Sequence, residues 1–184
     1  MPDVQRPTLV VVSGPPASGK TTLAHALAQA IPCPAVCRDE IKEGMVHAHG
    51  GDFQAGSGDP LTVRTLPVFF DVLRVLVTAG VTVVAEAAFQ DRLWRQGLEP
   101  LSELSQLRVV QCAAADDVVR QRLDRVRPAH GDRSQFAQAA LAGEPPFAGF
   151  ERLSLPVPSI FVDTTYGYAP DLPSIVAFAS GRAD

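Results

Sequence analysis

The chain has 184 residues, which suits one domain with a substantial core. Hydrophobic residues make up 46% and charged residues 20%, a composition typical of globular rather than disordered proteins. The net charge of −4 gives no general attraction to nucleic acid, and no apolar run approaches the ~20 residues needed to span a bilayer.

Short apolar runs alternate with longer amphipathic stretches along the chain, and each change of pattern predicts a change of element. Pro67 falls inside a long apolar stretch and is expected in the first turns of a helix or at its kink. In chain order, the predicted elements are a strand over 8–14, a helix over 21–31, a strand over 35–37, a helix over 39–48, a loop over 50–60, a helix over 61–80, a strand over 81–87, a helix over 91–105, a strand over 107–114, a helix over 116–126, a strand over 159–165 and a helix over 171–180.

Five strands separated by helices indicate an α/β fold, with a parallel sheet covered by helices on both faces. The sequence has no internal repeat and no linker long enough to divide it, so we predict a single domain over 1–184. Residues 127–158 are the least regular part, rich in Pro, Gly and Arg, with one short helix predicted near 134–142. This region is interpreted as an insertion that moves.

The segment "GPPASGKT", from Gly14 to Thr21, matches the phosphate-loop pattern G-x-x-x-x-G-K-[ST] at every fixed position. It also follows an apolar strand and precedes a helix, the context in which such a loop turns its backbone N–H groups toward phosphate oxygens. Lys20 supplies a charge for the β- and γ-phosphates, and the Thr21 hydroxyl can ligate Mg²⁺. The predicted nucleotide contacts in this loop are Gly14, Pro15, Pro16, Ala17, Ser18, Gly19, Lys20, Thr21 and Thr22.

A phosphate loop alone does not separate a kinase from a GTPase or a motor. The sequence contains no N-K-x-D-type segment for reading guanine, and no apolar run that ends in paired acidic residues. The third strand ends instead in the single carboxylate of Glu86. At that strand end Glu86 could hold Mg²⁺ through water, and the alternative is a capping or solvated carboxylate.

A charged cluster follows the second strand, where Asp39 and Lys42 are three residues apart. Ligands of open parallel sheets bind at the carboxyl ends of the strands, so Asp39 is expected on the same edge as Lys20, Thr21 and Glu86. A carboxylate there can orient an acceptor hydroxyl and take its proton during phosphoryl transfer. Lys42 would share the helix face of Asp39 and steady the acceptor or the γ-phosphate. The alternative for Asp39 is an N-cap of the helix over 40–48.

The three cysteines, Cys33, Cys37 and Cys112, do not form a disulfide framework. The four histidines show no zinc-ligand spacing, so these cysteines are interpreted as ordinary thiols in a reducing compartment. The N-terminus lacks the basic start and the small-residue cleavage site of a secretory signal. We therefore expect a cytoplasmic protein.

The segments "GPPASGKTT", "RDEIKEGM", "VVAEAAFQDRLWR" and "FVDTT", with an Arg-rich stretch before the last, resemble the P-loop small-molecule kinases of the AAA_33 type. That group is similar to the kinase domain of polynucleotide kinase, to chloramphenicol phosphotransferase and to zeta toxins. The resemblance covers roughly residues 8–165. It implies a P-loop kinase fold with strand order 2-3-1-4-5 and a lid, with ATP and Mg²⁺, and transfer of the γ-phosphate to a hydroxyl.

In this family a D-x-x-R motif after the second strand supplies the general base and a cation. Here the motif reads Asp39-Glu40-Ile41-Lys42, and the Lys lacks the bidentate fork of Arg. The acidic residue of the third strand is commonly Asp in the family and is Glu86 here. Arg95 matches an arginine often found after the third strand, with a solvated helix residue as the alternative.

The family's lid carries arginines that close over the phosphates, and the stretch "RQRLDRVRPAHGDR" offers several. Arg122 is the predicted nucleotide contact and Arg125 the predicted catalytic arginine, with Arg133 as a further candidate. The alternative interpretation of these arginines is that they form salt bridges along one face of a helix. Phe89 and Trp94 are candidates for the wall of an acceptor pocket, although core packing is the preferred interpretation of Trp94.

The combined prediction is an ATP-dependent kinase that phosphorylates a small hydroxyl compound. The residues predicted to act in catalysis are Asp39 as general base, Lys20, Lys42 and Arg125; the predicted metal contacts are Thr21 and Glu86. One alternative is a 5′-hydroxyl polynucleotide kinase, which the acidic charge balance disfavours. The other is an ATP-binding regulatory module that is not a kinase. No segment of the sequence identifies the acceptor.

Overall fold

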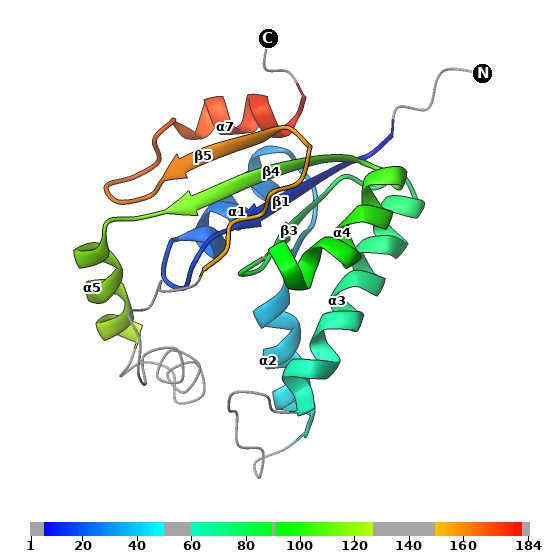
Figure 1. Ribbon diagram of the computed structural model, residues 1–184, viewed down its shortest axis with the longest axis horizontal. Coiled ribbons are helices and arrows are strands. Elements are labelled where there is room, and N and C mark those ends of the chain that lie inside the picture. Colours follow the sequence, from blue (N-terminus) through cyan, green and yellow to red (C-terminus); the bar gives the residue numbers. More distant parts are fainter. Residues whose placement is uncertain (1–5, 50–59, 90, 127–149, 182–184) are drawn as a thin grey trace.

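The computed structural model describes residues 6–49, 60–89, 91–126 and 150–181 (Figure 1). The predicted loop over 50–60 lies almost wholly outside the described residues. So do most of the predicted lid over 127–158, its short helix near 134–142, and Arg133. The lid therefore stays a prediction.

The described elements follow the predicted order, with boundaries that differ by two residues at most. None of the described helices is both long and apolar enough to cross a membrane. The elements are β1 (Thr8–Ser13), α1 (Lys20–Ala30), β2 (Ala35–Cys37), α2 (Arg38–His49), α3 (Pro60–Thr78), β3 (Val83–Glu86), α4 (Asp91–Leu104), β4 (Gln106–Ala113), α5 (Asp116–Val126), β5 (Ser159–Asp163) and α7 (Leu172–Ala179).

The five strands form one parallel sheet in the order β2-β3-β1-β4-β5, which confirms the predicted fold class and strand order. β1 lies at the centre, paired with β3 on one side and β4 on the other. Cys37 at the end of β2 is in register with Glu86 at the end of β3, and Glu86 is in register with Val12 near the end of β1. The carboxyl ends of these strands therefore meet at one edge of the sheet.

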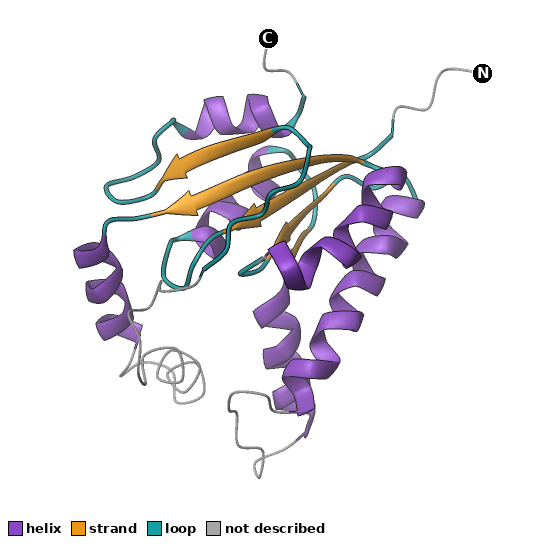
Figure 2. Ribbon diagram, viewed as in Figure 1, coloured by secondary structure: helices purple, strands orange, loops and turns teal. Residues whose placement is uncertain are grey.

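Helices cover both faces of this sheet (Figure 2). Successive residues of a strand point to opposite faces, and β1 divides accordingly. Leu9 and Val11 pack with α3 and α4, whereas Val10 and Val12 pack with α1 and α7. The buried apolar area on both faces explains why the strands read as continuous hydrophobic runs rather than alternating ones.

An aromatic cluster fills the core between α3, α4 and the segment after β3. Phe89 and Trp94 lie with ring centroids 4.6 Å apart, and Phe69 lies within 5.9 Å of both. Phe89 has no exposed surface and Trp94 is 7% exposed. Core packing is thus the role of Trp94, and the interpretation of Phe89 as a wall of an acceptor pocket is wrong.

Two helical glycines give opposite expectations for substitution by alanine. A Cβ at Gly97 in α4 would lie 2.2 Å from Cζ of Phe70, whereas a Cβ at Gly44 in α2 meets nothing within 4 Å. Overpacking a core typically costs about 1–3 kcal/mol, and alanine gains about 1 kcal/mol over glycine in a helix. We expect Gly97→Ala to lower the free energy of unfolding by up to about 2 kcal/mol and Gly44→Ala to raise it by about 0.5–1 kcal/mol. Urea unfolding measures both, and equal stabilisation by the two substitutions would contradict the packing described around Gly97.

Candidate active site

The loop between β1 and α1 has a backbone shape that requires its glycines. Gly19 precedes α1 with φ 78°, in the left-handed region that favours glycine. A Cβ at Gly14 would lie 2.5 Å from Oγ of Ser18 and 2.6 Å from the carbonyl oxygen of Cys112. Gly14 is therefore needed for the close approach of the loop to β4, and Gly19 for the backbone conformation at the start of α1.

Several polar groups of this loop are left available for a ligand. Helix α1 has no side-chain cap at its N-terminus and no acidic residue in its first turn. Oγ of Ser18 is buried and, among the described residues, has no hydrogen-bond partner. Such a set of free donors, at the positive end of a helix, fits a phosphate group.

Two residues outside the motif, Thr164 and Arg122, form hydrogen bonds with the backbone of the loop. The Thr164 hydroxyl, buried after β5, donates to the Ser18 carbonyl at 2.6 Å. Nη1 of Arg122 donates to the Ala17 carbonyl at 3.2 Å, and Nη2 donates to the Thr164 carbonyl at 2.5 Å. Arg122 thereby ties α5 to the phosphate loop, and its predicted contact with the nucleotide stays a prediction.

A cavity of about 550 Å³ opens beside these contacts. Tyr168 and Gly167 from the loop after β5 lie on one side, and the start of α1 lies on the other. The residues lining it are Ala17, Gly19, Lys20, Thr21, Thr22, Arg122, Thr164, Gly167 and Tyr168. Arg125, in the last turn of α5, is exposed, and its catalytic role stays a prediction.

Lys20 and Glu86, both buried, and the half-buried Thr21 form a group at the carboxyl end of the sheet. Nζ of Lys20 lies 3.7 Å from Oε1 of Glu86, and the Thr21 hydroxyl is hydrogen-bonded to the same carboxyl. Burial raises the pKa of Glu86 and the nearby Asp39 raises it further, while Lys20 and Thr21 pull it down. The hydroxyl and carboxylate oxygens are the donors that Mg²⁺ prefers, so the residues present fit this ion.

The raised pKa of Glu86 gives an expected pH dependence of stability. The carboxyl of Glu86 stays protonated to higher pH in the folded protein than in the unfolded chain. The stability that the neutral carboxyl gives to the folded state is fully present below the ordinary pKa of 4.5. It is lost as the pH rises through the raised value. Glu86→Gln, which stays neutral, should melt close to wild type at pH 4 and at a higher temperature than wild type at pH 8.

Thermal melting of the nucleotide-free and Mg²⁺-free protein between pH 4 and 8 measures this difference. Glu103→Gln, at an exposed position of α4, is the matched control. A difference between Glu86→Gln and wild type that is the same at both ends of the range would contradict the burial argument.

Asp39 lies in the first turn of α2, which begins one residue earlier at Arg38. It therefore does not cap a helix over 40–48, as the alternative interpretation held. Its side chain is 70% exposed, and Nη1 of Arg38 lies 2.9 Å from Oδ1. Arg38, which sequence reasoning did not select, also donates to the Thr62 carbonyl of α3 at 3.3 Å. This anchoring gives the Asp39 carboxylate a defined position.

Lys42, one turn further along α2, is only 3% exposed, and its ammonium donates to the Thr62 hydroxyl of α3. A cavity of about 340 Å³ brings Lys42 and Asp39 together with residues of the phosphate loop and β3. Its lining consists of Thr21, Thr22, Cys37, Asp39, Glu40, Lys42, Glu43 and Glu86. The residues predicted to serve the acceptor and those predicted to hold the metal thus share one cavity.

Arg95 belongs to a different local structure. Its Nη2 donates to Asp91 at 2.8 Å and to the Ser154 carbonyl at 2.8 Å, and Asp91 accepts from the Ser154 N–H at 2.8 Å. Arg95 and Asp91 together hold the chain where it returns toward β5. With these contacts and a side chain that is 37% exposed, Arg95 is not simply a solvated helix residue, and its match to the family's arginine stays a prediction.

The AAA_33 family model, which describes an AAA domain, matches residues 9–144. No curated protein matches the sequence significantly. The family match includes the phosphate loop, Asp39, Lys42, Glu86 and Arg122.

Solved structures similar to this chain include several kinases. A protein from Chloroflexus aurantiacus provisionally assigned as a kinase is 25% identical, with a TM-score of 0.77, over 98% of this chain and all of that one. A gluconokinase from Sinorhizobium meliloti is 20% identical, with a TM-score of 0.60, over 96% of this chain and 94% of that one. The APS kinase of Mycobacterium tuberculosis, in complex with AMPPNP and APS, is 15% identical, with a TM-score of 0.62, over 96% and 99%.

Proposed function

The chain belongs to the AAA_33 family, and from this premise we propose that it is an ATP-dependent kinase that phosphorylates a hydroxyl group of a small molecule. One observation carries the proposal: the Asp39 carboxylate shares a cavity with Thr21, Thr22 and Glu86, beside the phosphate loop. An exposed carboxylate at that place can reach an acceptor next to the γ-phosphate. A gluconokinase and an APS kinase among the similar folds support a small acceptor.

The phosphate loop and Lys20 would bind the ATP phosphates. The free N–H groups at the start of α1 and the unpartnered Ser18 hydroxyl meet phosphate oxygens, and the Lys20 ammonium lies against the β- and γ-phosphates. Arg122, held by Ala17 and Thr164, lines the neighbouring cavity with Tyr168, where the rest of the nucleotide would lie. Such binding would leave the γ-phosphate next to the cavity that Asp39 lines.

Thr21 and Glu86 would hold Mg²⁺, the hydroxyl directly and the carboxylate through water. When bound, Mg²⁺ supplies positive charge that offsets the charge on the phosphate oxygens. Glu86 must ionise for this role, and the nearby Lys20 ammonium favours the ionised form. Because Glu86 is buried, its carboxylate is held inside the protein rather than in solvent.

Asp39 would orient the acceptor hydroxyl and accept its proton. As the acceptor oxygen bonds to the γ-phosphorus, the bond from that phosphorus to the bridging oxygen breaks, and its electron pair leaves with ADP. The proton goes to the Asp39 carboxylate and from there to solvent. Arg38 holds Asp39 in place, and Lys42, fixed by Thr62, offers a positive charge to the acceptor or to the transferring phosphoryl group.

A screen for acceptor-stimulated ADP formation tests the proposal. Sugars, sugar acids, nucleosides and other polyols would be tried beside a 5′-hydroxyl oligonucleotide, each with ATP and Mg²⁺. We expect one small acceptor class to raise ADP release, with one phosphorylated product formed for each ADP. Stimulation by the oligonucleotide alone would make the protein a polynucleotide kinase, and tight ATP binding without any stimulated turnover would favour a regulatory module.

A further inference from the structure

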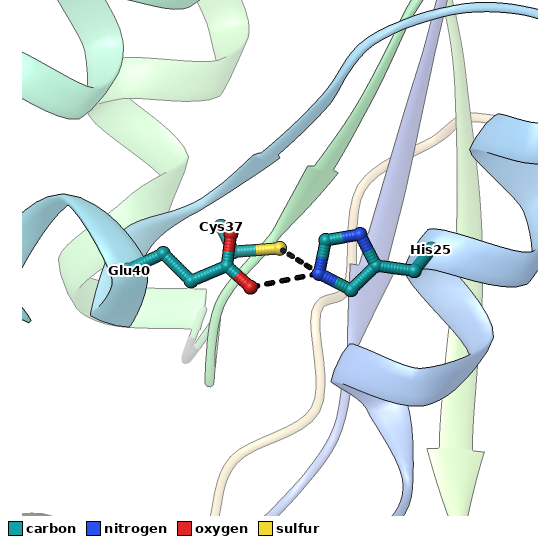
Figure 3. Close-up of side chains that lie close together, drawn as sticks. All are labelled: His25, Cys37 and Glu40. Atoms are coloured by element: carbon teal, nitrogen blue, oxygen red, sulfur yellow. Dashed lines mark hydrogen bonds and ion pairs between the residues drawn. The ribbon is translucent and has the colours of Figure 1, made fainter.

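Three side chains from three different elements converge beside the start of α2 (Figure 3). His25 comes from the middle of α1, Cys37 is the last residue of β2, and Glu40 lies in the first turn of α2. Their ligand atoms all lie within 4.8 Å of one another. Among the described residues, no other group of three His, Cys or acidic side chains brings its ligand atoms so close.

The distances within this group are close to those of a metal site. Nε2 of His25 lies 3.7 Å from Sγ of Cys37 and 2.7 Å from Oε1 of Glu40. Tetrahedral Zn²⁺, bound about 2.3 Å from sulfur and about 2.0–2.1 Å from nitrogen, places those two atoms about 3.6 Å apart. A nitrogen and an oxygen ligand of Zn²⁺ lie about 3.3 Å apart, so the contact of His25 with Glu40 has to open.

The side chains that would have to shift to bind a metal ion are the exposed ones, which have room to adjust. His25 and Glu40 are 50% and 42% exposed, whereas Cys37 is 2% exposed and is fixed at the end of its strand. The buried thiol gives the site a rigid ligand, and the two exposed side chains adjust around it. An exposed ion pair of His25 with Glu40 contributes little by itself and does not require a cysteine beneath it.

We propose that His25, Cys37 and Glu40 form a binding site for Zn²⁺ or a cation of the same class, with a fourth position open to solvent. Imidazole, thiolate and carboxylate are the zinc ligands of proteins, and three protein ligands with one open position are a familiar zinc arrangement. Mg²⁺ does not suit this site because it demands oxygen donors in octahedral geometry. The group therefore differs in donor type from the oxygen donors of Thr21 and Glu86, although Cys37 and Glu40 line the same cavity as those residues.

The local charge favours a cation at this place. The thiol lies beside the carboxyls of Glu86 and Glu40, both of which raise the pKa of Cys37 in addition to the effect of burial. A bound dication offsets that negative charge and displaces the thiol proton. Because the ligands come from α1, β2 and α2, the bound ion would also link α1, which follows the phosphate loop, to α2, which carries Asp39.

Co²⁺ titration of the metal-free, full-length protein under a non-thiol reductant tests the site without using enzymatic activity. We expect one Co²⁺ per chain and a thiolate-to-Co²⁺ charge-transfer band in the near ultraviolet, removed by equimolar Zn²⁺ and retained in excess Mg²⁺. Cys37→Ser should abolish the band. His25→Gln and Glu40→Gln should each weaken Co²⁺ binding by at least about tenfold, the lower end of the losses seen even for residues that only support a ligand.

Cys33→Ser and His47→Gln are the matched controls, because neither residue belongs to the group. Both should bind Co²⁺ as the wild-type protein does. Zn²⁺ at a hundred times its wild-type dissociation constant should also raise the melting temperature of the wild type by about 5–10 °C and that of His25→Gln by clearly less. His25 is half exposed, so this variant tests the site even if Cys37→Ser does not fold. The proposal is overturned if the wild type gives no thiolate band, if the band survives in Cys37→Ser, or if His25→Gln binds Co²⁺ normally.

Discussion

Replacement of Lys20 by alanine is expected to reduce ATP affinity by about 10–100-fold and turnover by at least about 10²–10³-fold. A hydrogen bond to a charged group is worth about 1.5–3 kcal/mol, and loss of one preorganised donor to a transition state costs turnover by the larger factor. Lys20 is 8% exposed and lies 3.7 Å from Glu86. No other described lysine lines the cavity beside Ala17 and Arg122.

Lys42→Ala provides the comparison, since Lys42 is the other lysine of the chain and is also buried. It lies on the acceptor side, bonded to Thr62, so its loss should raise the acceptor KM and leave ATP affinity within a factor of about three. Titration calorimetry with an ATP analogue and Mg²⁺, together with the ADP assay, separates the two effects. Unchanged ATP affinity and turnover in Lys20→Ala would remove the phosphate-binding assignment of the loop.

Asp39→Asn is expected to lower turnover by about 10²–10⁴-fold while leaving ATP affinity unchanged. General-base assistance is typically of that size, and asparagine nearly keeps the shape of aspartate but cannot accept the proton. The Asp39 carboxylate faces the cavity that also holds Lys42 and Glu43, and it is absent from the lining of the cavity beside Arg122. Nucleotide binding therefore does not depend on it.

A purely structural role of Asp39 gives a different result. In the first turn of α2 its charge would complement the helix dipole, an effect of about 0.3–1 kcal/mol that the asparagine loses. The melting temperature would then fall by a few degrees and turnover would survive. The assay pairs acceptor phosphorylation with thermal melting, and Asp71→Asn, an exposed carboxylate on α3, is the control. Full activity of Asp39→Asn with a productive acceptor would show that Asp39 has a structural role and is not the general base.

The phosphate loop could be predicted from the sequence because its properties are local. Gly14 and Gly19 are required by backbone geometry within a few residues, and Lys20 and Thr21 follow at positions that the loop itself sets. The alternation of apolar runs likewise indicated a parallel sheet, since the central strands β1 and β3 are covered on both faces. The order of the strands came from the resemblance to a family, and the structure confirms it.

Other features depend on side chains that meet only after the chain has folded. Arg95 was ambiguous in the sequence, and its contact with Ser154 joins residues 59 positions apart. Phe89 was considered for an acceptor pocket, but packing of α3 against α4 buries it completely. Arg38 was one charge among several, and the position of α3 gives it a role in holding Asp39.

The sequence by itself determined the phosphate loop, the succession of strands and helices, and the presence of Asp39 and Glu86 at strand ends. These follow from local backbone preferences and from the periodic burial of apolar residues. Only the tertiary structure decided that Cys37 lies in register with Glu86, and that His25 reaches both Cys37 and Glu40. Their spacings of 12 and 15 residues match no local metal motif, because strand register and helix packing, rather than distance along the chain, bring these ligand atoms together.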